Sequence, residues 1–210
     1  MEDLARQLLT VDQFYQWVVE QEHKFELVDG EPVMMAGANR RHDRIAANAI
    51  RVIGNHLQGH RCQPFTSDTY LRIPAGNLRQ ADMGIDCGRF EDTSLEASEP
   101  VLVLEILSPT TRMFDRNEKL EEYKTIPTLE YILLVDPDFP QARLYRRDAD
   151  RDWTSDRVTG LTAVVEMRQL GLALSLGDLY FGLGFRPRPT LVEPPDTPAS
   201  KFTIWFSQRR

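Results

Sequence analysis

The most apolar stretch of the chain is Val101-Leu102-Val103-Leu104-Glu105-Ile106-Leu107, and a second apolar run follows at residues 130–136. Near-continuous apolar runs of this length are typical of strands that are covered on both faces of a parallel sheet. We expect a helix over residues 114–124, ended by the proline at position 127. The sequence therefore predicts a strand–helix–strand unit over residues 101–136, with two parallel strands.

Further elements extend this unit in both directions. Apolar residues at helical spacing predict helices over residues 11–21 and 39–56. The pair Asp29-Gly30 predicts a hairpin over residues 25–35, because glycine accepts a positive φ at no steric cost. Short strands are expected at residues 65–73 (one strand or a bent pair), 83–87, 142–147, 153–158 and 163–167, and one helical turn at 175–180. This element pattern predicts an α/β (α+β) fold around a mixed sheet.

The 210 residues suit one domain with an appendage. We predict that residues 1–185 form the domain. Five prolines between Pro187 and Pro198 mark an extended linker, and the apolar residues after it predict a β-prone tail, so that linker and tail together cover 186–210. The tail could pair with a sheet edge, in this chain or a partner chain, or be disordered.

Composition excludes several classes of protein. No apolar run approaches the roughly 18 residues of a membrane span, and the first residues carry no secretory signal pattern. The two cysteines, Cys62 and Cys87, are expected to be reduced thiols of a cytoplasmic protein. Asp and Glu outnumber Lys and Arg by 32 to 25, which argues against non-specific coating of nucleic acid but not against an acidic site that holds metal.

Glu105 is out of place in its apolar strand. A buried ionised carboxylate costs several kcal/mol unless it is paired or bound to metal. It could instead lie at a strand end and reach solvent or a buried arginine. Asp82 opens a strand about twenty residues earlier, and two carboxylates on adjacent strands can share a Mg²⁺ ion. Asp82 alone could be a turn or cap residue, and Asp86 is a rival ligand.

Three other polar residues each allow a structural and a functional interpretation. Lys119 shares a helix face with Asp115 and Tyr123, so it either forms a surface ion pair or turns toward the carboxylates. In the second case its ammonium could orient a water molecule or stabilise phosphate charge. Glu26 could complete a metal site or face water. His42 lies on an apolar helix stripe, where a lone histidine is more often a packing residue than a ligand.

The order of these pieces resembles the Uma-type family, whose members are described as restriction endonucleases of the PD-(D/E)XK nuclease superfamily. The resemblance runs from about residue 25 to 145. Its landmarks are residues 25–31, His42, Ala81-Asp82, residues 103–110, Asp115, Glu118-Lys119, Tyr123 and residues 130–137. The resemblance implies a restriction endonuclease-like core with a mixed central sheet flanked by helices.

The resemblance also implies roles for single residues. Asp82 and Glu105 resemble the two metal-binding acids, and Glu26 resembles an additional acid of many superfamily members. The superfamily's lysine normally stands two residues after the second acid, where this chain has Leu107. In the family this lysine has moved to the next helix, which makes it Lys119. A catalytic role therefore requires the Lys119 ammonium to reach the carboxylates of Asp82 and Glu105.

The expected function is metal-dependent hydrolysis of phosphodiester bonds, with DNA as substrate and Mg²⁺ or Mn²⁺ as cofactor. Arg40, Arg41 and Arg44, on the polar side of the second helix, are candidates for contacts with the DNA backbone. A homodimer is expected by analogy with nucleases that cut both strands. The alternatives are a catalytically silent DNA-binding or assembly module and an enzyme that acts on a smaller phosphate ester.

Overall fold

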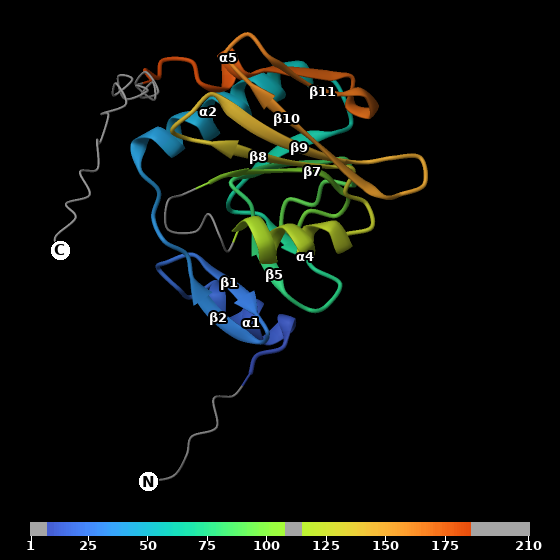
Figure 1. Ribbon diagram of the computed structural model, residues 1–210. Helices are drawn as coiled ribbons and strands as arrows, with labels where there is room; N and C mark the ends of the chain where they lie inside the picture. Colours follow the sequence, from blue (N-terminus) through green and yellow to red (C-terminus); the bar gives the residue numbers. More distant parts are fainter. Residues whose placement is uncertain (1–7, 108–114, 186–210) are drawn as a thin grey trace, which may run out of the picture.

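Residues 8–107 and 115–185 are described by a computed structural model, with a six-stranded mixed sheet at its centre (Figure 1). The strands follow the order β10-β9-β8-β7-β6-β3. Their bounds are β3 (Gln63–Thr66), β6 (Met83–Asp86), β7 (Pro100–Ile106), β8 (Tyr131–Asp136), β9 (Gln141–Arg147) and β10 (Trp153–Thr159). β7 and β8 pair in parallel, and the other neighbours in this sheet pair antiparallel. The predicted parallel neighbours within a mixed sheet are confirmed.

Helices cover both faces of this sheet (Figure 1). One face carries α2 (Arg40–His56), β11 (Val164–Met167), the short helix η2 (Arg168–Leu170), β12 (Leu172–Ser175) and α5 (Leu176–Leu179). The other face, called the α4 face below, carries η1 (Asp115–Lys119) and α4 (Leu120–Thr125).

The side chains of β7 divide between these two faces. Leu102, Leu104 and Ile106 pack into the core under α2, whereas Val103 packs into the core under α4. Side chains alternate between the faces of a strand, so Glu105 points to the α4 face. The strand is apolar on both sides because both sides are covered, and its one carboxylate is turned toward η1 and α4.

A smaller, four-stranded sheet has the order β2-β1-β5-β4. Its strands are β1 (Phe25–Val28), β2 (Glu31–Met34), β4 (Tyr70–Arg72) and β5 (Leu78–Gln80), and α1 (Val11–Val18) packs on it. Figure 1 shows α1, β1 and β2 grouped beside the large sheet. Asp29 and Gly30 have φ angles of 50° and 80°, as the predicted hairpin turn requires.

Several element boundaries differ from the prediction. Residues 65–73 form two strands in different sheets, because a turn over residues 67–69 separates β3 from β4. β5 was not predicted, since it has three residues and two of them are polar although all three are buried. Of the helix expected over 114–124, the described part consists of the π-helical turn η1 and of α4, which continues to Thr125.

The prediction of two reduced thiols is wrong. Cys62 and Cys87 form a disulfide, with Cα atoms 3.9 Å apart. β3 and β6 pair antiparallel with Gln63 opposite Asp86, so the next register position brings the two cysteines face to face. Composition alone could not reveal this pairing, because it depends on the register of two strands that are about twenty residues apart.

The predicted linker and tail, residues 186–210, lie outside the described residues, and the division into domain and tail stays a prediction. None of the helices within residues 8–107 and 115–185 is long and apolar enough to cross a membrane.

Candidate active site

Asp82 and Glu105 lie across from each other where β6 begins and β7 ends. Met83 pairs with Leu104, and extending this antiparallel register by one residue places Asp82 opposite Glu105. The backbone N–H of Ile106 donates a hydrogen bond to Asp82 Oδ2 at 2.7 Å. Glu105 thus lies within β7, and Asp82 lies one residue before the neighbouring strand β6. The role of the two acids as metal ligands stays a prediction.

Glu26 reaches the same region from the small sheet. Its side chain is buried, and its Oε1 accepts a hydrogen bond from the backbone N–H of Gln80 at 2.9 Å. Its Oε2 accepts a hydrogen bond from Arg79 Nη1 at 3.1 Å. Gln80 ends β5, and Asp82 follows two residues later just before β6. The junction between the two sheets therefore lies between Glu26 and the Asp82–Glu105 pair.

Lys119 connects the acids of the two sheets. Its Nζ lies 2.9 Å from Glu26 Oε1 and 3.8 Å from Glu105 Oε1, and the residue is only 7% exposed. An ammonium buried to this extent is stable only beside charges of opposite sign. The Lys119 ammonium therefore reaches the carboxylate of Glu105, one of the two acids that a catalytic role requires it to reach. The burial of Lys119 excludes the alternative of a surface ion pair. The Asp115 side chain lies outside the described side chains.

Tyr123 follows Lys119 by one helical turn and contacts Glu105. Its hydroxyl donates a hydrogen bond to Glu105 Oε1 at 2.6 Å, and the ring is completely buried. Burial, together with the carboxylates of Glu105 and Glu26, raises the pKa of Tyr123 well above its usual value. The phenol therefore stays protonated and fixes the orientation of Glu105.

His42 contacts Asp82, which corrects its expected role as a packing residue. The ring Nε2 lies 3.0 Å from Asp82 Oδ2, and both side chains are about one-sixth exposed. Burial alone would lower the pKa of His42, but the carboxylate of Asp82 outweighs it and the pKa is raised. The imidazolium form is thereby favoured beside Asp82. His42 lies in the first turn of α2, and its place on this helix could be predicted from the sequence, which carried no signal for the contact with Asp82.

A second buried network, not predicted from the sequence, supports Glu26. Arg79 is 1% exposed, and its guanidinium forms two hydrogen bonds with Glu122, at 2.5 and 3.0 Å, in addition to its bond with Glu26. Asn77 donates a further hydrogen bond to Glu122 at 2.7 Å. Arg79 thus joins the small sheet to α4, the helix that directly follows Lys119.

Asp86, the rival metal ligand, is not part of this group. It lies at the opposite end of β6 from Asp82 and faces Pro100. Its carboxylate accepts hydrogen bonds from the backbone N–H groups of Gly88, Ser98 and Glu99. Asp86 therefore holds the loop between β6 and β7 in place.

The three arginines of α2 differ in their surroundings. Arg40 and Arg44 are exposed. Arg41 donates hydrogen bonds to the carbonyl oxygens of Pro137 and Gly184, and its guanidinium lies 4.8 Å from the centre of the Phe185 ring. Arg41 therefore already binds other parts of the protein. DNA contact by any of the three stays a prediction.

The acids of this site suit a hard cation, although they do not enclose one. Within residues 8–107 and 115–185, no group of three or more His, Cys, Asp or Glu side chains is arranged to hold a metal ion. Mg²⁺ is commonly held by one or two carboxylates together with water and substrate phosphates. Asp82 uses Oδ2 for its contacts with Ile106 and His42, so Oδ1 is the oxygen through which it would bind. Two opposed carboxylates therefore fit Mg²⁺ or Mn²⁺ better than a closed structural metal site.

Comparison with known proteins gives consistent matches. Residues 11–177 match the model of the Uma2 family, described as "Putative restriction endonuclease". In Synechocystis sp., "Uncharacterized protein slr1290" is 30% identical over 84% of this chain and 94% of its own length. "Uncharacterized protein sll1609" of the same organism is 29% identical over 76% and 92%. A crystal structure from Anabaena variabilis, described as "a putative nuclease belonging to DUF820", has a TM-score of 0.65 at 21% identity, over 82% of this chain and 97% of that one. The family match supports a nuclease activity, and the solved structure supports the fold.

Proposed function

The chain belongs to the Uma2 family, and from this membership and the arrangement of its buried charges we propose that it is a metal-dependent endonuclease that hydrolyses phosphodiester bonds in DNA. The proposal rests mainly on the position of the Lys119 ammonium, which lies between Glu26 and Glu105. Glu105 stands at the end of β7, opposite Asp82. Burying a cation together with two carboxylates costs several kcal/mol of desolvation, which a purely structural role could avoid with apolar residues.

Asp82 and Glu105 would hold Mg²⁺ or Mn²⁺ through their carboxylate oxygens. When bound there, the ion supplies Lewis-acid polarisation of a phosphoryl oxygen and lowers the pKa of a coordinated water molecule. The chain itself fixes both carboxylates before substrate arrives. The Ile106 N–H and His42 hold Asp82, and the Tyr123 hydroxyl holds Glu105.

Lys119 would bind the attacking water or the non-bridging oxygens of the phosphate. An ammonium placed before the reaction begins stabilises developing negative charge without having to reorganise. Glu26 holds this ammonium in place, and Arg79 in turn holds Glu26. Glu26 and Arg79 therefore act as positioning residues, whereas Lys119 would touch the reacting group.

DNA is the proposed substrate, with Arg40 and Arg44 of α2 as candidates for contact with its backbone. α2 is adjacent to the site, because His42 in its first turn contacts Asp82. We further propose a homodimer, in which two such sites would cut the two strands of a duplex.

Hydrolysis assays on several substrates test the proposal. The wild-type protein would be incubated with plasmid, single-stranded DNA, RNA and a small phosphodiester, each with Mg²⁺, with Mn²⁺ and with EDTA. We expect cleavage of plasmid with either metal and none with EDTA. Glu105→Gln keeps the shape of the side chain but removes its charge, and it should abolish cleavage. Glu121→Gln is a matched control, since Glu121 is exposed on α4 and pairs only with Lys124 among the described residues.

Each alternative function gives a different result in these assays. A catalytically silent module would leave all four substrates intact, and an enzyme for small esters would hydrolyse only the last. Equal cleavage by wild type and Glu105→Gln would mean that the activity comes from another site or from a contaminant.

A further inference from the structure

We propose that Arg143 and Arg157 form a second subsite, which binds phosphate groups of the nucleic-acid backbone a few nucleotides away from the one that is cleaved. The subsite rests on the proposed function, because it needs a nucleic-acid substrate. It occupies a pocket of about 200 Å³ on the large sheet, lined by residues of β8, β9 and β10 and by Leu107. This volume exceeds the roughly 30 Å³ that one water molecule occupies in the liquid, so a group larger than water can enter.

The strand registers place this pocket in line with the candidate active site. Glu105 pairs with Leu134, Leu134 with Arg143, and Arg143 with Arg157. Register partners on neighbouring strands point to the same face of a sheet. Arg143 and Arg157 therefore share the α4 face with Glu105.

The same registers fix how far the arginines lie from the acids. Neighbouring strands are about 4.8 Å apart, so the Cα atoms of Arg143 and Arg157 lie about 10 and about 14 Å from that of Glu105. One DNA strand advances by at least about 3.4 Å per phosphate, its rise along the helix axis, so these distances span at most about three to four nucleotides. A backbone that runs along this row can reach the acids and both arginines at once.

The pocket also lies at the end of the sheet where ligands commonly bind. Leu107 and Asp136, which line it, lie at the carboxyl ends of the parallel strands β7 and β8. In open sheets of mixed helix and strand, ligands bind in the crevice outside these strand ends. The carboxylate oxygen Oδ1 of Asp136 accepts hydrogen bonds from the backbone N–H groups of Asp138 and Phe139, so one acid of the pocket is engaged in a local turn.

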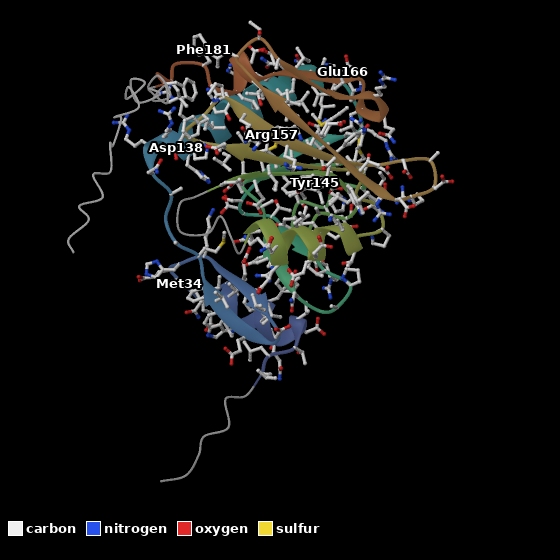
Figure 2. The ribbon with its side chains drawn as sticks, viewed as in Figure 1. Met34, Asp138, Tyr145, Arg157, Glu166 and Phe181 are labelled. Atoms are coloured by element: carbon white, nitrogen blue, oxygen red, sulfur yellow. A yellow bond between two sulfur atoms is a disulfide. The ribbon has the colours of Figure 1, made fainter. Side chains whose placement is uncertain are left out.

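The two arginines have few partners among the residues that the structure describes. Within residues 8–107 and 115–185, neither Arg143 nor Arg157 forms an ion pair, and Arg143 only donates a hydrogen bond to Ser155 Oγ at 3.3 Å. Arg157 is exposed on the outermost strand, where Figure 2 labels it, and Arg143 is half-buried. By contrast, Arg146 on the other face of β9 is paired with Asp156. In a chain with a net charge of −7, two guanidinium groups that form no ion pair with the described residues favour an anionic ligand.

Arginine suits a phosphodiester because its planar guanidinium can donate two hydrogen bonds to one phosphate group. Contacts of this kind fix the position of a nucleic acid and carry no sequence information. The pocket is therefore a positioning subsite, and it would align the bond that is to be cleaved with Asp82 and Glu105. Its loss should raise KM for DNA more than it lowers kcat.

Salt-dependent binding of a fluorescein-labelled 20-bp DNA duplex tests the proposal. Binding by full-length protein would be followed by fluorescence anisotropy at several salt concentrations, with Ca²⁺ in place of Mg²⁺ and a gel to confirm that the duplex stays intact. The double variant Arg143→Gln/Arg157→Gln should bind on the order of tenfold more weakly per lost arginine. Each lost phosphate contact should also reduce the slope of log K against log salt by about 0.9.

The matched control is Arg146→Gln, which makes the same change of charge on the opposite face of β9 and should keep the wild-type slope. If the double variant does not fold, the same binding measurement would be made on Arg157→Gln alone, because Arg157 is exposed. If Arg143 and Arg157 only protect the edge of the sheet, the double variant should keep the wild-type slope of log K against log salt. An unchanged slope in a double variant that binds DNA as tightly as wild type would refute the subsite while leaving the proposed function intact. Failure of the wild-type protein to bind DNA at all would refute both.

Discussion

Replacing Lys119 with methionine tests the charge arrangement of the site more sharply than other single changes. Lys119→Met keeps an unbranched side chain of similar length but removes the ammonium from between Glu26 and Glu105. Removing one partner of a buried ion pair usually costs about 3–5 kcal/mol, because the other charge is left uncompensated. Glu26 would keep its bonds with Arg79 and the Gln80 N–H, and Glu105 would keep Tyr123. We therefore expect a loss near the lower end of that range, about 3 kcal/mol.

Urea and thermal unfolding measure this loss. For a chain of this size, about 3 kcal/mol corresponds to a fall in Tm of roughly 6–12 °C. Adding Glu26→Gln to Lys119→Met should recover part of the loss, since it removes the carboxylate that was left without its ammonium. The same Lys119→Met variant should cleave DNA at least 10²-fold more slowly, by about the factor that the loss of one preorganised charge donor costs. An unfolding midpoint equal to that of wild type would mean that the ammonium is solvated and forms no stabilising ion pair with Glu26 or Glu105.

Three further predictions concern the surroundings of the site. Arg79→Met should lower the free energy of unfolding by about 3–5 kcal/mol, because two buried carboxylates lose their partner; a loss under 1 kcal/mol in urea would contradict this. Cys62→Ser opens a disulfide loop of 25 residues and should cost about 3 kcal/mol under oxidising conditions, with no difference from wild type once both are reduced. The raised pKa of His42 means that its attraction to Asp82 stabilises the fold fully below about pH 6.5 and is lost as the pH rises through the raised value. The difference in stability between wild type and His42→Gln should therefore shrink from pH 5.5 to 8.5, and a difference that grows would refute the ion pair.

Glu105 could be singled out from the sequence because it interrupts an apolar strand. Asp82 alone was equally consistent with a turn or cap residue, and the family resemblance gave it a role as the first acid. Lys119 needed the family resemblance, since its helical spacing was equally consistent with a surface ion pair. Its buried position between two acids then depended on how η1 and α4 pack over β7, which spacing alone does not determine.

The remaining partners could not be predicted because their contacts join distant parts of the chain. Arg79 binds Glu26 across 53 residues and Glu122 across 43 residues, so these contacts exist only after both sheets and α4 have assembled. Burial of Arg79 inside a three-residue strand also contradicts the usual exposure of arginine. His42 could be placed on its helix, but its contact with Asp82 depends on the angle between that helix and β7.

Single-turnover cleavage of an end-labelled DNA duplex, measured while Mg²⁺ is titrated, tests directly whether Asp82 and Glu105 together hold the catalytic ion. Wild-type protein should cleave at a rate that rises with Mg²⁺ and saturates, whereas Asp82→Asn should show no cleavage at any Mg²⁺ concentration while it unfolds cooperatively like wild type. Cleavage that persists in EDTA, or an Asp82→Asn variant with the wild-type rate, would contradict this role of the two acids.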